Sequence, residues 1–406
     1  MGLVLKPNWQ YGFKVTYEFN TDVFVSRNGT ENRRSLRGDP RSTVRLKTWR
    51  QGEGAQDLQV LFDTGHVEAF DIPDPSREAV VDVDLTAGID QVVLTSLPSW
   101  VVEGASVVLV NGDVTEHHRV QGVAGLTVDF EEPALLNFPA GTKLFGSFYS
   151  LVSKSFKGTW LTAAVFEVDL DCRALPGTDK LPDPAPWGTV FDGLPVFDIE
   201  PDWSGGSQVT VTGSREMNDF GRGVISTRDV RGFPSQDTRW SFLQVDRDSV
   251  AKVVDFFRLQ KGMRGSFYTS SRVSDMTADE DVVSGSNTLR IKGSAIANAY
   301  ASRPYNRAIT MITVDGTVIR RKITDISLFD NGLGWGYDWG NNWGGLGANT
   351  DSLITIDGTW GTDIAQADVK LISWLRKSRF AADKLTVEWL TSTVATIAVT
   401  LRSLRN

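Results

Sequence analysis

Apolar and polar residues alternate along much of the 406-residue chain, and this period of two predicts β-strands. The alternation is clearest in WLTAAVFEVDLDCRAL (160–175) and WLTSTVATIAVTLRSL (389–404), and shorter alternating segments lie at 13–19 and 208–211. Asn-Gly in LVNGDVTEHHRV and Asp-Gly in TVDGTVIRRKI suit the positive φ angles of tight hairpin turns. We therefore expect a mostly β protein.

A helical period appears once in each half of the chain. Residues 246–259 carry apolar side chains at i, i+3, i+4 and i+7, and Gly262 is placed to end a helix there. These apolar residues are Val250, Val253, Val254 and Phe257. Residues 55–62 show a weaker form of the same pattern, so we predict one short helix in each half.

Comparison of the chain with itself reveals two similar halves. Pro7-Asn8-Trp9 reappears as Pro201-Asp202-Trp203 at an offset of 194, and Trp160-Leu161-Thr162 reappears as Trp389-Leu390-Thr391 at an offset of 229. The offset of 194 also relates four identical pairs, namely Arg34 with Arg228, Gly38 with Gly232, Pro40 with Pro234 and Arg45 with Arg239. Because these matches keep their order, the sequence predicts a tandem duplication.

Each half is expected to be a β-sandwich or barrel core with one short helix, interrupted by an inserted small β-barrel-like domain. The first core comprises 1–80 and 147–175, with the insert 81–146. The second core comprises 189–272 and 366–406, with the insert 273–365. Between the halves, four prolines in 176–188 predict an extended linker.

The second insert contains NGLGWGYDWGNNWGGLG, residues 331–347, whose seven glycines make a helix too costly at roughly 1 kcal/mol each. The segment lies where the second half has gained 25 residues over the first, since the offset grows from 204 to 229. We expect a loop whose large aromatic residues contact a partner protein or a glycan, the alternative being a flap that plugs its own domain. These residues are Trp335, Tyr337, Trp339 and Trp343.

A basic segment stands out in a chain of net charge −8. Residues 27–50 hold eight basic residues and two acids, and such a segment seeks acidic partners. We expect contact with a neighbouring copy or another ring of the same assembly, with nucleic acid second, through Arg27, Arg33, Arg34, Arg37 and Arg41. For Arg34 and Arg45, a salt bridge inside the core is the alternative.

The chain offers little sign of catalysis or metal binding. Its single cysteine, Cys172, lies on an alternating strand and is expected in the core, and it excludes an intrachain disulfide. His117 and His118 are neighbours on a predicted strand and so point to opposite faces. We expect no enzyme, no cofactor and no metal. We expect no membrane span either, because no apolar run reaches about 18 residues.

One core has an arginine-rich segment ending in Gly-Asp-Pro-Arg at 38–41, then a strand, a short helix and residues 65–70, whose clearer counterpart in the other core is GMRGSFYTS at 262–270. This order resembles the tube-type domain of bacteriophage minor tail proteins. These include the distal tail and hub proteins of long-tailed phages. The resemblance implies a structural ring protein of the virion tail tip, made in the host bacterial cytoplasm, with the tail tube, hub and fibre proteins as partners. It supplies no catalytic residues, and nucleic acid would meet the ring only by passing through its lumen.

Two ring domains in one chain favour a trimer with a pseudo-six-fold ring, as in a hub, over a hexamer of a distal tail protein. The rival interpretation is a carbohydrate-binding module or glycan-active enzyme that uses the aromatic loop. A glycan array would distinguish the two.

We expect that replacing Trp335, Trp339 and Trp343 by alanine leaves the chain folded but weakens attachment of a tail partner or glycan, because buried tryptophans commonly anchor interfaces. Thermal unfolding and a binding assay measure the two effects. Loss of thermal stability with intact binding would make the loop an internal plug instead.

Overall fold

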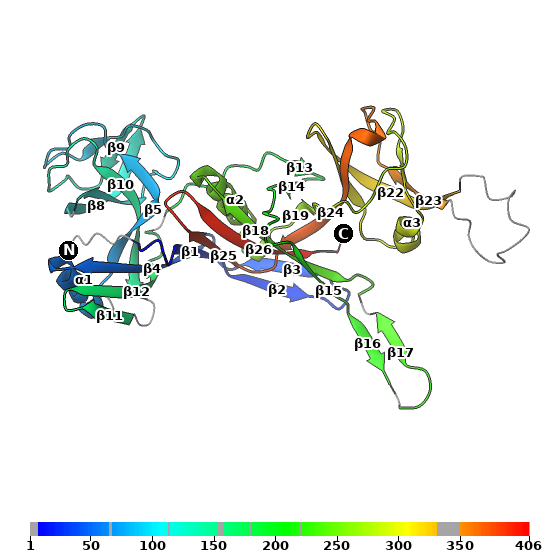
Figure 1. Ribbon diagram of the computed structural model, residues 1–406, viewed down its shortest axis with the longest axis horizontal. Coiled ribbons are helices and arrows are strands. Elements are labelled where there is room, and N and C mark those ends of the chain that lie inside the picture. The colour runs from blue at the N-terminus through cyan, green and yellow to red at the C-terminus, as the bar shows by residue number, and fades with distance from the viewer. Residues whose placement is uncertain are drawn as a thin grey trace, which may run out of the picture.

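The computed structural model of the protein describes residues 7–64, 67–112, 114–152, 157–178, 180–219, 221–229, 231–330 and 350–405. Half of the chain is in strands, which confirms a mostly β fold. The molecule is elongated, with a central sheet along its length and an inserted region at either end of one side (Figure 1).

The first half supplies nine elements outside its insert. They are β1 (Phe13–Glu18), β2 (Thr21–Val25), β3 (Glu31–Ser35), β4 (Arg41–Gln51), α1 (Glu53–Thr64), β5 (Phe70–Val80), β10 (Lys143–Val152), β11 (Lys157–Thr162) and β12 (Val165–Ala174).

The second half supplies a similar series. It consists of β13 (Val190–Phe191), β14 (Leu194–Phe197), β15 (Gln208–Thr212), β16 (Arg215–Asn218), β17 (Ser226–Asp229), β18 (Ser235–Gln244), α2 (Arg247–Gln260), the 3₁₀ turn Gly262–Arg264, β19 (Phe267–Ser270), the 3₁₀ turn Gln366–Asp368, β24 (Val369–Phe380), β25 (Lys384–Trp389) and β26 (Ala395–Ser403).

Eight of these strands form one continuous antiparallel sheet. Its order is β11–β12–β4–β1–β25–β26–β18–β15, so the two halves meet at the pair β1–β25. β10 and β5 extend from β12 in the first half, as β24 and β19 extend from β26 in the second. Each half therefore has the same strand order.

The register is the same in both halves as well. Arg45 on β4 lies opposite Asp171 on β12, and Arg239 on β18 lies opposite Thr400 on β26. The offsets of 194 and 229 found in the sequence convert the first pair into the second. They also convert Lys14–Arg45 into Gln208–Arg239 and Trp160–Phe166 into Trp389–Ala395. A shared register is what a tandem duplication would leave, and the duplication itself stays a prediction.

The helix predicted over 246–259 is present as α2, and its ends have identifiable causes. The Asp246 side chain accepts a hydrogen bond from the backbone N–H of Ser249, which caps the first turn. Lys261 (φ 51°) and Gly262 (φ 65°) both take the left-handed conformation that ends the helix. The four apolar residues of the predicted stripe are all buried, so the helical pattern is confirmed.

Both helices cover the apolar face of the sheet. Alternate residues of β1, such as Phe13 and Val15, and of β4, such as Val44 and Leu46, point into one core that also holds Cys172. Burial raises the pKa of the Cys172 thiol to about 12, so this thiol stays protonated and unreactive near neutral pH.

The two inserts have apolar clusters of their own. The first contains β6 (Gln91–Val93), β7 (Ser106–Asn111), β8 (Val114–Ala124) and β9 (Thr127–Phe130), and the second contains β20 (Thr288–Ile291), α3 (Ala295–Tyr300), β21 (Ala308–Thr313), β22 (Val318–Asp330) and β23 (Thr350–Ile356). The hairpins predicted at Asn-Gly and Asp-Gly are β7–β8 and β21–β22. The short helix α3 was not predicted, because six residues are too few to show a helical period.

The two adjacent histidines of the first insert face different surroundings. His118 is buried and stacked on Phe130, with ring centroids 4.2 Å apart. Burial lowers the pKa of His118, although Glu116, with Oε1 3.2 Å from His118 Nε2, opposes the shift. His117 is half-buried instead, with Nδ1 3.0 Å from Asp71 Oδ2.

We predict that His118 makes the first insert sensitive to acid. A histidine whose pKa is lowered by folding binds a proton more readily in the unfolded chain. Its contribution to stability is therefore present above the ordinary value of 6.5 and is lost as the pH falls below it. His118→Phe should keep more of its pH 7 stability at pH 5 than the unmodified chain does, measured by denaturant unfolding. The same pH dependence in both proteins would contradict this assignment, and His117→Phe is the matched control.

Candidate functional site: the junction and open edges of the central sheet

The junction between the two halves is a fully paired strand contact. All six residues of β1 lie opposite the six residues of β25. On the apolar face, Phe13 lies opposite Trp389 and Val15 opposite Val387, and all four side chains are buried. A third apolar pair, Tyr17 with Leu385, completes that face.

The polar face of the same junction is held by side-chain contacts. Lys14 Nζ lies 2.9 Å from Glu388 Oε1, and Lys384 Nζ lies 3.5 Å from Glu18 Oε1 at the other end. These exposed ion pairs contribute about 0 to 1 kcal/mol each, so they set the register more than the stability. The buried apolar pairs supply most of the free energy of the junction.

The β2–β3 hairpin strengthens the junction by lying on the second half. The Arg33 guanidinium donates hydrogen bonds to the carbonyl oxygens of Met263 and Gly265, at 3.1 and 3.0 Å. Glu31 receives two hydrogen bonds from Arg379, at 2.7 and 2.9 Å, and both side chains are nearly buried. The hairpin is thus fixed by a buried, bidentate ion pair.

A third contact joins the start of α2 to the first half. Arg247 Nη2 lies 3.2 Å from Glu78 Oε2, and Lys143 Nζ lies 2.8 Å from Glu78 Oε1. Burial alone would raise the pKa of Glu78, but hydrogen bonds from Lys143 and Arg247 lower it below its usual value. Glu78 therefore remains ionised at neutral pH and links the two halves.

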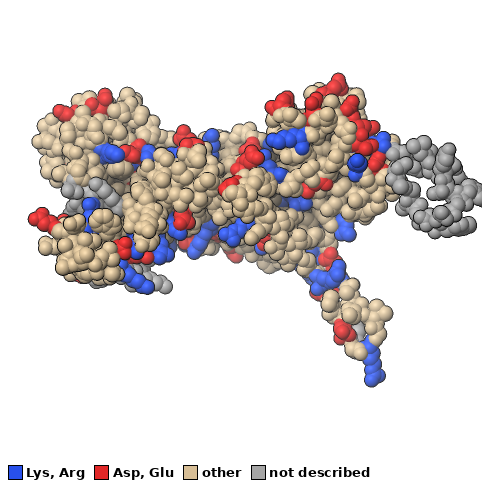
Figure 2. All heavy atoms as spheres, in the orientation of Figure 1, with Lys and Arg blue, Asp and Glu red and all other residues tan. Residues whose placement is uncertain are grey.

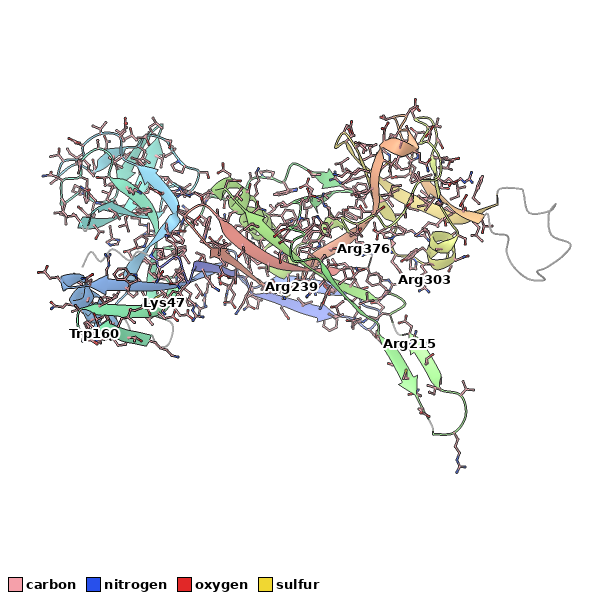
Figure 3. The ribbon with its side chains drawn as sticks, in the orientation of Figure 1. Lys47, Trp160, Arg215, Arg239, Arg303 and Arg376 are labelled. Atoms are coloured by element: carbon pink, nitrogen blue, oxygen red, sulfur yellow. The ribbon has the colours of Figure 1, made fainter. Side chains whose placement is uncertain are left out.

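The outer edges of the sheet, β11 and β15, correspond by offset to the two junction strands. β11 is the counterpart of β25, and β15 is the counterpart of β1. In the described part of the chain, β11 pairs with β12 alone and β15 pairs with β18 alone. Figure 3 shows Trp160 of β11 at one end of the molecule, far from Arg239 of β18 beside the other edge.

Both edges expose apolar side chains. Trp160 is 45% exposed where its counterpart Trp389 is 5% exposed, and Val209 is 52% exposed where its counterpart Val15 is 1% exposed. Neither edge strand contains proline, and the side chains of β15 carry no charge, so the usual protections against strand pairing are weak. β11 and β15 therefore each have one edge that is available to pair with a further strand.

The β16–β17 hairpin projects from the body of the molecule (Figures 1 and 2). We call this hairpin the arm. Arg215 lies opposite Asp229 in the arm, as Thr21 lies opposite Ser35 in the β2–β3 hairpin, and the offset of 194 relates the two pairs. All the strand residues of the arm are exposed, whereas β2–β3 lies on the second half. The arm is therefore the counterpart of the β2–β3 hairpin, which packs against the core of the other half.

Charged side chains on the polar face of the sheet are largely paired in the cross-strand direction. Arg45 bonds to Asp169 at 3.1 Å, Lys47 to Glu167 at 2.8 Å and Arg402 to Asp237 at 2.6 Å. Each hydrogen-bonded carboxylate raises the pKa of its basic partner. Arg45 thus has a salt bridge within the first core domain, which was the alternative given for it, but on the exposed polar face, and this face has a mixed charge.

The arginines proposed as partner contacts lie in different settings. Arg33 donates hydrogen bonds within the chain to the carbonyl oxygens of Met263 and Gly265. Arg27 Nη2 lies 3.7 Å from Glu216 of the arm, and both side chains are largely exposed. Arg34 is exposed on β3, while Arg37 and Arg41 line a cleft of about 500 Å³. Contact of these arginines with another chain stays a prediction.

Trp335, Tyr337, Trp339 and Trp343 lie outside the described residues. Within the described ranges, no three His, Cys, Asp or Glu side chains gather so that they could hold a metal ion. None of the helices in that part of the chain has the length and apolar character needed to cross a membrane.

Comparison with known proteins leaves the family open. No family model matches the chain, and no curated protein matches its sequence.

Sequence reasoning did not predict the β1–β25 pair or the open edges. β1 lies within the predicted strand 13–19, whereas β25 precedes the alternating segment predicted at 389–404, and pairing between residues 13 and 389 leaves no local pattern. A usable signal was the repeat itself. Trp-Leu-Thr occurs at 160–162 and at 389–391, so a strand contact made by one half of the chain suggests that the other half can make the same contact.

We predict that Arg379→Ala lowers the free energy of unfolding by about 3 kcal/mol, because it leaves the Glu31 carboxylate buried without its bidentate partner. Lys384→Ala, at an exposed pair with Glu18, should cost less than about 1 kcal/mol. Urea unfolding measures both. Equal losses would show that the hairpin contact is not a fixed part of the junction.

Proposed function

We propose that the protein is a structural subunit of a closed ring whose copies join edge to edge, and that the ring belongs to a phage tail tip. The observation that carries the proposal is the β1–β25 junction. It joins two strand sets of equal order and register, and the counterparts of its two strands are exposed at the two ends of the sheet. Repeating that junction between copies extends the sheet without introducing a new kind of contact.

The six-fold symmetry of a tail tube favours three copies. Each half of the chain supplies one set of sheet strands. If the same contact joins successive sets within and between chains, a ring of six sets has approximate six-fold symmetry. Two sets per chain then require three chains. This symmetry suits a component between a six-fold tail tube and a three-fold fibre, which is the position of a hub.

The two faces of the sheet support this arrangement. The apolar face is covered by the helices and the core, while the polar face carries paired charges of both signs along β4, β12 and β26. In a closed ring the polar face lines the lumen, where nucleic acid passes without a specific site. The inserts lie outside, available to the tail tube, to fibre proteins or to the host surface.

The resemblance of Gly-Asp-Pro-Arg at 38–41 and GMRGSFYTS at 262–270 to tube-type tail domains supports the virion location. A ring subunit connects the tail tube to fibre or receptor-binding proteins, and its role needs no reaction and no cofactor. The open edges favour this interpretation over a carbohydrate-binding module, because a sugar-binding platform does not need unpaired edge strands.

We predict a particle of about 134 kDa, three times the 44.7 kDa of the chain, in light scattering of the purified protein. Dilution should convert it to single chains, because the joining strands are short and exposed. Six copies in one ring would refute the hub arrangement. A single chain at all concentrations that is also absent from virions would refute the structural role.

A further inference from the structure

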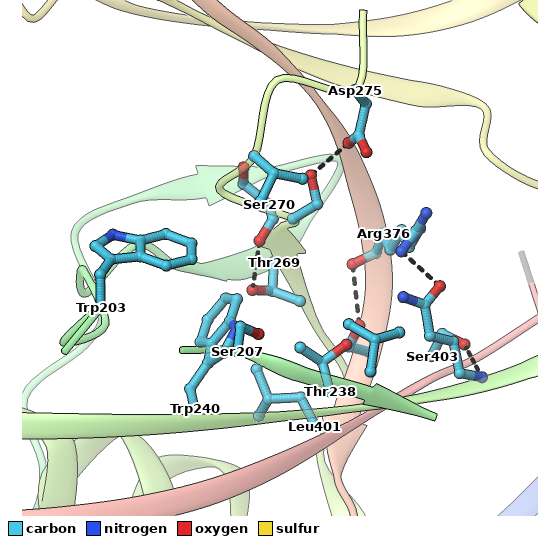
Figure 4. A pocket seen from close by; sticks show the side chains of 15 residues that line it. Trp203, Ser207, Thr238, Trp240, Thr269, Ser270, Asp275, Arg376, Leu401 and Ser403 are labelled. Carbon is cyan, nitrogen blue, oxygen red and sulfur yellow. Dashed lines mark hydrogen bonds between the residues drawn. The ribbon is translucent and has the colours of Figure 1, made fainter. Parts of the chain in front are cut away.

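A cavity of about 310 Å³ lies beside the open edge β15. Trp203 stands at one side and Arg376 at the other, with Ser207, Thr238 and Trp240 between them (Figure 4). Trp203 is 43% exposed, so the cavity opens to the surface. Its volume is at the lower end of the range of small-molecule sites, which is also enough to take one large side chain.

The cavity exists because small or polar residues replace large apolar ones. Its lining residue Ser207 is the counterpart of Phe13 by the offset of 194. Arg376 occupies the register position of Phe148, since Thr269 pairs with Arg376 as Ile72 pairs with Phe148. Phe13, Ile72 and Phe148 are fully buried in the first half. The second half therefore has an opening where the first half is filled.

We propose that this cavity is the socket for Trp160 of a second copy of the chain. The inference rests on the proposed function, and it identifies the residue and the register by which copies join. The template is the internal junction, in which Trp389 lies opposite Phe13 on the apolar face. Trp160 is the counterpart of Trp389, and Ser207 is the counterpart of Phe13.

The register of the contact follows from the same offsets. Lys14 pairs with Glu388 and Val15 with Val387 in the chain. Their counterparts place Gln208 opposite Thr159 of the next copy, and Val209 opposite its Gly158. Trp160 then lies opposite Ser207, at the mouth of the cavity.

The local structure around Trp160 suits insertion. Its ring lies 4.8 Å from that of Phe166, which is buried and fixes the side of the sheet to which Trp160 belongs. Gly158 is needed next to it, because a Cβ there would come 2.4 Å from Phe166 Cζ. The space beside Gly158 is therefore filled by the Phe166 ring, and Val209 of the other copy can pack against that ring.

Cross-linking tests the register directly. In the double variant Gln208→Cys/Thr159→Cys, an added oxidant should join copies into dimers and trimers on a non-reducing gel. Val209→Cys/Thr159→Cys is the matched control, because a slip of one residue turns the two side chains to opposite faces. Cys172 does not compete, since it is buried.

Substitution tests the socket. Trp160→Ala should raise the dissociation constant of the assembly at least 30-fold, the change that corresponds to about 2 kcal/mol. Trp49→Ala is the matched control, because Trp49 is 49% exposed but lies on the polar face of β4. Circular dichroism and thermal unfolding check that Trp160→Ala is folded. If Trp160→Ala is unfolded, cross-linking of Gln208→Cys/Thr159→Cys alone tests the proposal.

The outcomes separate the two proposals. Specific cross-linking of Gln208 with Thr159 supports both. A three-copy particle that does not cross-link at this pair, or that cross-links equally in the control, overturns the socket and leaves the ring. A protein that stays a single chain and is absent from virions overturns both.

Discussion

Every edge of an antiparallel sheet presents unpaired backbone N–H and C=O groups, and the architecture of this protein depends on how they are satisfied. Within the chain, β1 and β25 satisfy one another and turn two strand sets into one sheet. This pairing leaves β11 and β15 as the end strands of the sheet. Each of them therefore has one edge of unpaired backbone groups within the described part of the chain. An assembly that repeats the internal contact pairs both end strands, β11 and β15, by closure.

The internal contact and the proposed contact between copies are expected to differ in how permanent they are. The internal one is filled by Phe13 and Trp389 and reinforced by the buried Glu31–Arg379 pair. The external one has a cavity at the position of Phe13 and an arm that is exposed along its strands. Burying one tryptophan per contact gives an association that depends on concentration, whereas the internal junction persists in the single chain. In the proposed ring, this difference lets subunits fold first and assemble afterwards.

Local patterns predicted much of the fold. The stripe of Val250 and Phe257 located α2, and alternation located β12 and β26, because these signals depend on neighbours in sequence. Pairing between residues 13 and 389 could not be predicted, since loop closure over such a separation leaves no local trace. The cavity beside β15 could not be predicted from the sequence for a related reason. The offset of 194 makes Ser207 the counterpart of Phe13, but only the structure shows that Phe13 is buried at a strand junction and that Ser207 lines a cavity.

The most direct test of the account is a cryo-electron microscopy reconstruction of the assembled particle with no symmetry imposed. The account predicts three chains, with the sheet continuing from β15 of one copy to β11 of the next in the register that β1 and β25 have within the chain. A closed particle in which β11 and β15 both face solvent would contradict the claim that the internal junction is the model for assembly.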